Sequence, residues 1–453
     1  MATNRMFRGV RRPGDSEALV VNQMPDADRV AAPVSKSGAE GGTTILFVTR
    51  LPPDPDGPGG TQRAMQLLRA LASIGIVDLV LLHRSSDLEA VKTLSGPAQS
   101  LVRNFAALEI SEWAPAKHSV SKWKWKWRQI EEVFRLHAVD APRFSASMIS
   151  KIASVLPESD YDVIFAGRLS SACIVNQLMS NGQLRARTRV SDLDDLISRF
   201  RERELKVVGA AQGMLRRILQ RISIRRVRNA ELEICRHWDA VGLPVAEELE
   251  WLRARVPAAA LQLFPNVVDR RLLPIQRSTK PNILFVGHLG YTPNIDGLRT
   301  FLTEAWPCIL QRVPEATLTV VGMYPDLALS QFVADNGGKL YANVPSVEPY
   351  YQNSTLVISP IRYASGTRIK IIEAMAFGRP VVSTKIGAEG LQIKSGDHAL
   401  IVDDMKEFSE AVVRLCTDDD LYDHIVFSAN VLQKQKYSLD ALTEEIREAI
   451  MCP

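Results

Sequence analysis

The feature that most constrains this chain is a pattern that occurs twice: an apolar run, a loop containing glycine, a helical segment, and another apolar run. The first copy begins at residues 43–49 (TTILFVT) and passes through the loop RLPPDPDGPGG to the helical spacing of residues 61–74. The second begins at residues 282–286 (NILFV) and passes through the loop GHLGYTPNID. This order is typical of the start of a parallel α/β domain, so we expect two such domains.

The limits of the two predicted domains follow from where the alternation stops and restarts. Residues 43–265 are expected to form the first doubly wound domain and residues 270–435 the second. A helix at 436–453 is expected to pack back towards the first domain. The length agrees, because 453 residues exceed what one ordinary core holds. Ligands of parallel sheets bind at the carboxyl ends of the strands, so two such edges are expected to face one cleft.

Composition places the chain among ordinary globular proteins. Hydrophobic residues make up 46% and charged residues 23% of it. A net charge of +4 is too small to argue for nucleic acid by itself. The five cysteines form no CxxC pair, so neither a zinc knuckle nor a disulfide framework is predicted. Residues 1–42 are polar and lack the apolar core of a secretory signal, and no run is apolar enough to span a bilayer. We therefore expect a disordered tail on a cytoplasmic protein.

The segment SGTRIKIIEAMAFGRP (365–380) predicts a helix with an unusual amino end. Ser365 and Gly366 are expected to open it, yet the first turn carries Arg368 and Lys370. The amino end of a helix is partly positive, so each cation there is disfavoured by roughly 0.3–1 kcal/mol. The two charges become favourable if an anion is bound at the helix start.

Phosphate fits this requirement. Free amides near Gly366 and Thr367 can donate to phosphate oxygens, while Arg368 offers a planar fork and Lys370 a point charge. The alternative is that both cations are solvated, or that Lys370 pairs with Glu373 three residues on.

The same segment carries a family resemblance. The stretch GTRIKIIEAMAFGRPVVSTKIGAEGL (366–391) resembles the nucleotide-sugar-binding motif of retaining GT-B glycosyltransferases, the "glycosyl transferases group 1" family. Within that family it is similar to a bacterial branch associated with exopolysaccharide and cell-surface glycan assembly. The segments VPSVEPYYQNSTLVIS and FPNVVD also match. The resemblance is specific over residues 282–403, and weaker over 43–75 and 160–200.

This resemblance implies a GT-B fold and the transfer of a sugar, with retention, from a nucleotide diphosphate donor to a hydroxyl of a glycan or lipid-linked acceptor. It also implies that Glu373 accepts hydrogen bonds from the ribose hydroxyls of the donor. The family has a second acid, which binds the donor sugar, at the position of Ser365. The serine puts the donor-sugar contact in doubt. It leaves open a catalytically degenerate nucleotide-sugar-binding partner protein, or another GT-B activity such as a sugar-nucleotide epimerase or a disaccharide synthase.

Further donor-binding residues are expected in two loops. The family's basic pair usually lies in the first loop of the second domain, where this chain has Gly287 and His288 but no Arg or Lys. Arg368 and Lys370 would then stabilise the charge on the departing diphosphate, and no metal or other cofactor is expected. In the first domain, Gly59 and Gly60 are expected to approach the donor phosphate or the acceptor. The alternative is a tight strand-to-helix turn.

An acidic cluster and two basic segments remain. Asp192, Asp194 and Asp195 resemble a Mg²⁺ site, but such metal sites belong to a different glycosyltransferase fold, so we favour acceptor binding or a structural role. Residues 121–128 alternate Lys and Trp, and residues 211–228 contain Arg and no acid. Both patterns suit anionic lipid headgroups at the inner face of the cytoplasmic membrane. Ordinary packing with solvated Arg, and RNA binding, are the alternatives.

Overall fold

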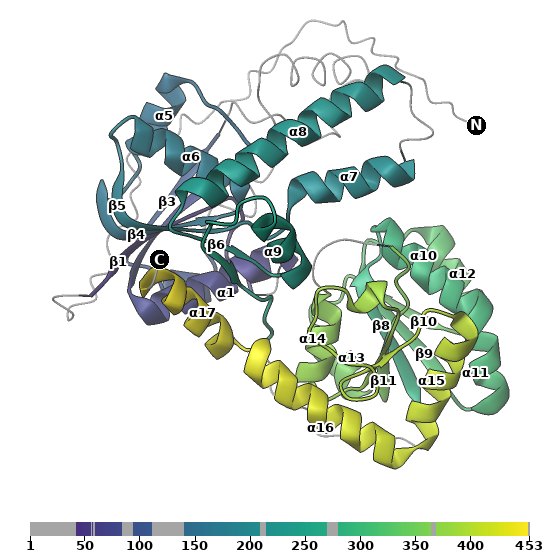
Figure 1. Cartoon of the computed structure of the whole chain (residues 1–453). Helices are drawn as coiled ribbons and strands as arrows, with labels where there is room; N and C mark the ends of the chain where they lie inside the picture. The colour runs from purple at the N-terminus through teal and green to yellow at the C-terminus, as the bar shows by residue number, and fades with distance from the viewer. Residues whose placement is uncertain are drawn as a thin grey trace, which may run out of the picture.

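The computed structural model describes residues 42–55, 57, 59–83, 94–110, 140–208, 214–269, 280–363 and 368–451. Most of the predicted N-terminal tail, the Lys-Trp repeat at 121–128, and Ser365, Gly366 and Thr367 lie outside the described residues. Two parallel sheets, each covered by helices on both faces, form the body of the chain (Figure 1). The predicted fold class of two doubly wound domains is confirmed.

The first sheet has seven strands in the order β3-β2-β1-β4-β5-β6-β7. Alternate side chains of its central strand point to opposite faces, and both faces are buried: Ile45 and Phe47 lie in one core, and Leu46 and Val48 in the other. The strands are β1 (Thr44–Thr49), β2 (Ile76–His83), β3 (Asn104–Glu109), β4 (Asp160–Gly167), β5 (Arg185–Asp192), β6 (Ala240–Leu243) and β7 (Leu261–Leu263). The helices are α1 (Gly59–Ile74), α3 (Gly96–Gln99), α5 (Ala146–Ala153), α6 (Leu169–Ser180), α7 (Ile197–Val208), α8 (Met214–His237) and α9 (Ala246–Arg253).

The second sheet has six strands in the order β10-β9-β8-β11-β12-β13. Its central strand alternates in the same way, with Ile283 and Phe285 in one core and Leu284 in the other. The strands are β8 (Asn282–His288), β9 (Thr317–Met323), β10 (Lys339–Ala342), β11 (Leu356–Ser359), β12 (Val381–Ser383) and β13 (Leu400–Ile401). The helices are α10 (Thr292–Thr300), η4 (Phe301–Ala305), α11 (Trp306–Arg312), α12 (Leu327–Asp335), α13 (Glu348–Gln352), α14 (Ile369–Ala376), η5 (Ile386–Ala388), α15 (Met405–Thr417), α16 (Asp419–Lys436) and α17 (Leu439–Met451).

The last two helices connect the domains. Helix α16 packs on α14 of the second domain, and α17 packs on α1 of the first (Figure 1). Ser438 separates the two helices, and its hydroxyl accepts a hydrogen bond from the amide of Ala441 in the first turn of α17. Leu442, Ile446 and Ala449 of α17 complete the apolar core beneath β1. The chain therefore returns to the first domain after building the second.

Three helix boundaries differ from the sequence prediction. Helix α1 begins at Gly59 rather than near residue 61. The helix expected after the predicted loop GHLGYTPNID begins within that loop, at Thr292, and contains a π-helical turn, η4, directly before α11. Pro307, in the first turn of α11, has no amide hydrogen for an i→i−4 bond, which accounts for a change of register there. The third difference concerns α14, which begins at Ile369 with Arg368 as its N-cap residue.

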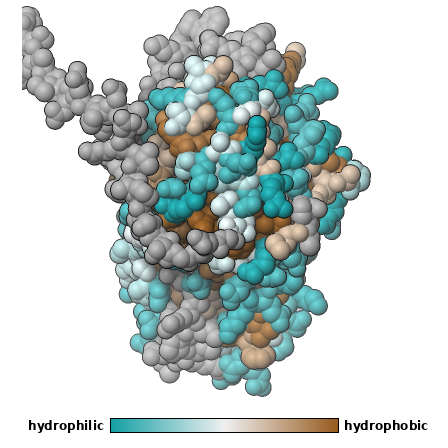
Figure 2. Space-filling view, turned by 90° about the vertical axis from the view of Figure 1, so that its left-hand side faces the viewer, coloured by the Kyte–Doolittle hydropathy of each residue, from teal (hydrophilic) through white to brown (hydrophobic). Residues whose placement is uncertain are grey.

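Hydrophilic side chains predominate on the face of the molecule shown in Figure 2, and hydrophobic surface appears there in separate patches. This agrees with the burial of the apolar side chains in the cores on both faces of each sheet. Among the described helices, none combines the length and apolar character that crossing a bilayer requires.

Candidate functional site

Two helix starts, one from each domain, meet at the carboxyl edges of the sheets. A Cβ placed on Gly59, the first residue of α1, would lie 3.3 Å from Cδ1 of Ile369, the first residue of α14. A Cβ on Gly60 would lie 2.7 Å from Cδ1 of Leu51 and 3.0 Å from Nη2 of Arg168. A side chain at residue 60 would therefore require the side chains of Leu51 and Arg168 to move. The structure brings the predicted glycine pair next to the predicted basic helix start.

Lys370 is half-buried at this contact, with its ammonium group directed into the protein. Its ammonium group Nζ donates a hydrogen bond of 2.8 Å to Oδ1 of Asn294 and lies 4.6 Å from the ring centroid of Phe285. A Cβ on Gly287 would be 3.2 Å from Nζ, so the glycine leaves the space beside the ammonium open. Burial, with a smaller effect from neighbouring Arg368, lowers the pKa of Lys370 to about 7. A bound anion would raise this pKa again.

Arg368 lies immediately before the helix rather than in its first turn, which corrects the sequence prediction. Its side chain is only 6% exposed, and Nη2 donates to the carbonyl oxygen of Ile386 at 3.2 Å. Burial lowers the pKa of Arg368, and the carboxylate of Glu389 partly offsets this effect. The alternative of two solvated cations is therefore wrong, because Arg368 is buried and the ammonium group of the half-buried Lys370 is directed inward. The two cations repel each other, and we call them the cation pair.

Glu373 follows one turn after Lys370 on the same helix. Its Oε2 accepts a hydrogen bond of 3.0 Å from the hydroxyl of Tyr351, which is fully buried. Burial and the nearby Glu373 carboxylate raise the pKa of Tyr351, so its hydroxyl keeps its proton. Lys370 makes no ion pair with Glu373 or with any other acid in the described part of the chain, because its ammonium faces Asn294. Glu373 is half-buried, which leaves part of its carboxylate accessible to a ligand.

The predicted loop residues lie at the end of β8. Gly287 and His288 are the last two residues of this strand, and Asn294 Nδ2 donates to the His288 carbonyl oxygen at 3.0 Å. The ring of His288 is exposed and lies 5.4 Å from the ring of Tyr324, which is 62% exposed just after β9. These two aromatic rings therefore lie next to Gly287, the glycine that adjoins the ammonium group of Lys370.

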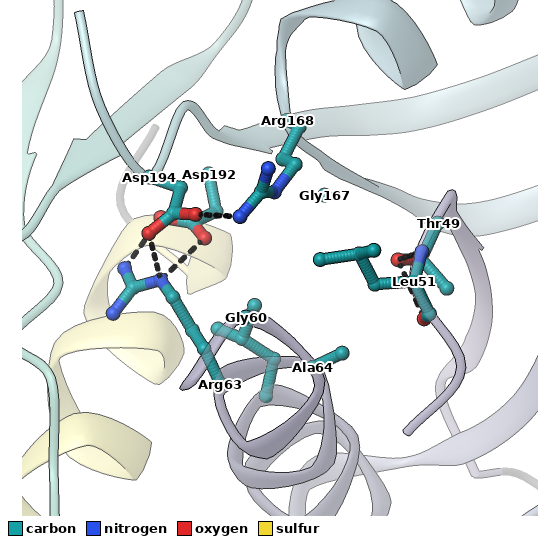
Figure 3. Close-up of a pocket in the computed structure, with 10 residues that line it drawn as sticks. Thr49, Leu51, Gly60, Arg63, Ala64, Gly167, Arg168, Asp192 and Asp194 are labelled. Carbon is teal, nitrogen blue, oxygen red and sulfur yellow. Dashed lines mark hydrogen bonds and ion pairs between the residues drawn. The ribbon is translucent and has the colours of Figure 1, made fainter. Parts of the chain in front are cut away.

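On the first-domain side, arginines engage two of the three predicted aspartates (Figure 3). Arg63 of α1 holds Asp192 through two hydrogen bonds, of 2.9 Å and 2.6 Å, and also donates to Oδ1 of Asn266 at 2.8 Å. Arg168, directly after β4, forms an ion pair with Asp194. These contacts surround a small cavity of about 10 Å³ at the ends of β1, β4 and β5, close to the volume that one water molecule requires.

The backbone at this edge is strained. Arg168 has φ of 76° and Asp194 has φ of 63°, in the region that favours glycine. Such conformations cost about 1–3 kcal/mol each and concentrate at functional sites. The surrounding fold therefore holds Arg168 and Asp194 in backbone conformations that these residues would not adopt by themselves. Within the described ranges, no three His, Cys, Asp or Glu side chains are grouped closely enough to hold a metal ion.

Asp195 differs from its neighbours because its carboxylate has no hydrogen-bond partner among the described residues. Burial and the adjacent Asp194 raise the pKa of Asp195 above its usual range. It also lies within electrostatic reach of Arg368 in the other domain. Arg203 of α7 forms an ion pair of 3.3 Å with Glu389, which joins the domains at the same place.

Sequence reasoning did not identify Asn294 or Arg168 as site residues. Asn294 lies in the segment GHLGYTPNID, and no local pattern marks its amide as the partner of a lysine 76 positions away. Arg168 follows the buried run of β4 directly, and a charged residue at the carboxyl end of such a strand was a usable signal.

Comparison with known proteins agrees with this architecture. Residues 280–418 match the family model described as "Glycosyl transferases group 1". A Klebsiella pneumoniae protein, an uncharacterised 44.6 kDa protein in the cps region, is 26% identical over 164 residues. That match spans 34% of this chain and 42% of the relative's length.

Several solved structures share the fold over nearly their whole length. Sucrose-phosphate synthase from Thermosynechococcus elongatus has a TM-score of 0.61 at 16% identity, covering 89% of this chain and 98% of that one. S. aureus TarM, solved with fondaparinux, alpha-GlcNAc-glycerol and UDP, has a TM-score of 0.59 at 11% identity, covering 90% and 100%. Anabaena Alr3699/HepE, solved with UDP-glucose, has a TM-score of 0.55 at 13% identity, covering 90% and 99%. Residues 280–418 thus match the model of the glycosyl transferases group 1 family, and the whole chain has a GT-B fold.

Proposed function

We propose that this protein transfers a sugar from a nucleoside diphosphate donor to a hydroxyl of a glycan or lipid-linked acceptor, with retention at the anomeric carbon. The observation that carries the proposal is the cation pair, Arg368 and Lys370, buried where α14 starts and facing the start of α1. Burying two like charges side by side is unfavourable, and a bound diphosphate would relieve it. The family match and the GT-B fold support a sugar nucleotide as the source of that diphosphate.

The proposed chemistry depends on fixed positive charge. Breaking the bond between the anomeric carbon and the diphosphate oxygen leaves the electron pair, and negative charge, on the departing diphosphate. Lys370 and Arg368 are already oriented and desolvated, so they stabilise this charge without reorganisation. Glu373, held by Tyr351, is proposed to accept hydrogen bonds from the ribose hydroxyls. Ser365, Gly366 and Thr367, with His288 and the glycines 59, 60 and 287, complete the proposed donor site.

We propose that transfer requires no metal, since the cation pair supplies the charge that Mg²⁺ would otherwise provide. Asp192 and Asp194 are engaged by arginines, which supports a structural role for them. Dialysis against EDTA should leave activity unchanged. If activity disappears and returns with Mg²⁺ or Mn²⁺, the three aspartates must be reinterpreted as ligands.

The donor can be identified with a thermal-shift panel of nucleotides and nucleotide sugars. UDP and UDP-glucose come first, because the similar structures of TarM and HepE hold UDP or UDP-glucose. Hydrolysis of the donor without acceptor then separates an enzyme from a degenerate binding protein, the alternative that Ser365 raises. A nucleotide that stabilises the protein but is never hydrolysed or transferred would favour the binding protein.

We propose that the product belongs to a cell-surface polysaccharide. The Klebsiella relative from a cps region supports this role, although the match spans 42% of that protein. A deletion strain should lose or shorten a surface glycan, and complementation with an Arg368→Ala variant should fail to restore it.

We also propose that the protein contacts the inner face of the cytoplasmic membrane through α8. One side of this helix is exposed and combines apolar residues with arginines at helical spacing, while Ile224 and Val227 on the other side are buried. Each basic residue near an anionic surface contributes about 1 kcal/mol, and exposed apolar side chains can enter the headgroup region. The exposed side consists of Met214, Arg217, Ile218, Arg221, Ile222 and Arg225.

Vesicle co-sedimentation tests this contact. The protein should pellet with vesicles containing anionic lipid at low salt and be released at high salt, because the attraction is largely electrostatic. Replacing the three exposed arginines of α8 with serine should reduce binding. A matched control replaces Lys406, Lys434 and Lys436 of the second domain and removes the same charge. Equal binding by both variants would refute α8 as the contact, and a wild-type protein that never pellets would refute membrane attachment.

A further inference from the structure

A second hollow lies in the second domain, beside the edge strand β10, and it begins at the amino end of β8. It has a volume of about 340 Å³, within the range of roughly 300–1,000 Å³ that ligand pockets occupy. Asn282, at its base, is the first residue of β8, whereas Gly287 and His288 are the last. Tyr341 of β10 pairs with Val321 of β9, which pairs with Val286 of β8, so the hollow extends along the sheet from the level of Asn282 to that of Val286. The residues that line it are Asn282, Thr319, Tyr341, Pro349, Tyr350 and Asn353, and we call it the tyrosine hollow.

The hollow exists because the sheet is incompletely covered there. Strand β10 is the edge strand, and Tyr341 on it is 40% exposed. The connection from β10 to β11 contains only the short helix α13 (Glu348–Gln352), which places Pro349 and Tyr350 at one side of the hollow. The rings of Tyr341 and Tyr350 stand 4.9 Å apart at an angle of 52°. Two aromatic faces therefore border an open pocket.

The floor of the hollow is polar and rigid. Asn282 Oδ1 accepts a hydrogen bond of 2.9 Å from Thr319, and Asn282 Nδ2 donates to the Asn353 carbonyl oxygen at 3.0 Å. Asn353 Nδ2 in turn donates to the Pro349 carbonyl oxygen at 2.8 Å. These bonds fix the two amides and still leave each with a further hydrogen to donate. The hydroxyls of Tyr341 and Tyr350 make no hydrogen bond to any residue in the described ranges.

This combination restricts the chemistry of a ligand. None of the lining side chains is charged at neutral pH, so a phosphate, a nucleotide or a metal ion would be desolvated there without compensation. A purely apolar ligand would cover amide and hydroxyl groups that need partners. A pyranose ring satisfies both conditions, since its C–H face can lie on an aromatic ring while its hydroxyls reach amides and phenols.

We propose that the tyrosine hollow binds a sugar ring of a neutral saccharide, as a second site separate from the donor site. Its volume and open border suit one or two rings of a longer chain. That the bound chain is the acceptor glycan rests on the proposed function, whereas saccharide binding itself does not. A saccharide site in the same domain as the cation pair, but outside the donor site, would retain a polymer during repeated transfer and increase its local concentration.

Saturation-transfer NMR with the full-length protein tests the proposal without nucleotide. The probes are glucose, maltotriose, cellotriose and chitotriose, so that a free monosaccharide and a chain are compared. At least one trisaccharide should receive saturation. Tyr341→Ala should weaken its binding by roughly three- to tenfold, the size of one lost ring contact, while Tyr341→Trp should retain it. Phe427→Ala is the matched control, because it removes an aromatic ring that is 72% exposed on α16.

The outcomes separate this proposal from the transferase proposal. Binding that is weakened at least threefold in Tyr341→Ala and retained in Phe427→Ala, with an unchanged thermal shift by the nucleotide, supports the hollow. Absence of saturation transfer from every saccharide, or equal binding by both variants, overturns it. If saccharide binds through Tyr341 but no nucleotide stabilises the protein, the hollow stands and the transferase proposal fails. Preference for glucose over the trisaccharides would overturn a site for chains.

Discussion

Donor binding is expected to weaken as the pH rises above neutrality, because Lys370 loses its proton. With an empty site, the pKa of Lys370 is about 7, since its ammonium group is buried and repelled by Arg368. A bound diphosphate supplies the anionic partner that protonated Lys370 lacks in the empty site. The protonated form should therefore bind the donor, and binding should draw a proton onto Lys370.

The magnitude follows from the fraction of Lys370 that is protonated. Suppose that only the protonated form of Lys370 binds the donor. The observed dissociation constant is then the constant for the fully protonated protein multiplied by 1 + 10^(pH − pKa), where the pKa is that of Lys370 in the empty site. Between pH 6 and pH 8.5 this predicts a weakening of about 30-fold, approaching tenfold per unit at the upper end. At pH 7, binding should take up about half a proton.

Isothermal titration calorimetry with UDP-glucose is the assay, since its diphosphate diester does not titrate in this range. Titrations in two buffers of different ionisation enthalpy give the proton uptake directly. Lys370→Arg should bind with little dependence on pH, and Lys370→Met should bind weakly at every pH. His288→Ala, which removes a histidine at the end of β8, should keep the wild-type slope. A wild-type dissociation constant that is constant within about twofold from pH 6 to pH 8.5 would refute the role given to Lys370.

Three further predictions concern the same helix. Without nucleotide, Lys370→Met should raise the Tm: the pKa of Lys370 is lowered in the folded state, so its destabilising effect is full below about pH 7 and disappears towards pH 10.5. Calorimetry at pH 7 and pH 10 checks this, and an equal gain at both would contradict it. Glu373→Gln should weaken nucleoside diphosphate binding by about 1–3 kcal/mol, measured by titration; unchanged affinity would count against the ribose role. Arg368→Ala should lower turnover by about a hundredfold with an unchanged circular dichroism spectrum; wild-type rates in the folded variant would remove Arg368 from catalysis.

Buried strands were predictable from the sequence because both faces of each central strand are covered. A run such as NILFV is almost continuously apolar, so it can be identified as a strand without knowing which face of the sheet is buried. Two edge strands, β3 and β10, were missed. In β10, Tyr341 and its neighbours are half-exposed, so the local sequence carries no apolar run. Edge strands depend on pairing with a partner that is distant in sequence, which local patterns cannot reveal.

The charged residues of the candidate site could be predicted from the sequence, but the contacts that hold them in place could not. The motif predicted that Arg368, Lys370 and Glu373 lie together, and they do lie on or beside α14. Periodicity could not reveal that Lys370 faces Asn294, because that contact joins residues 76 positions apart. The sequence also gave no sign that Arg63 binds Asp192, since a buried ion pair between a helix and a distant strand leaves no local pattern.

The return of the chain to the first domain through α17 has a mechanical consequence. The chain crosses between the domains twice, between Val267 and Val268 and again after Tyr437, and the two crossings are bonded to each other. Val268 N donates to the Tyr437 carbonyl oxygen at 3.1 Å, and Gln433 Nε2 donates to the Val268 carbonyl oxygen at 2.8 Å. The crossings therefore act as one hinge, about which the domains can rotate while both cores stay intact. Rotation about this single axis would change the separation of Gly59 and Ile369, and with it the access of a donor to the cation pair.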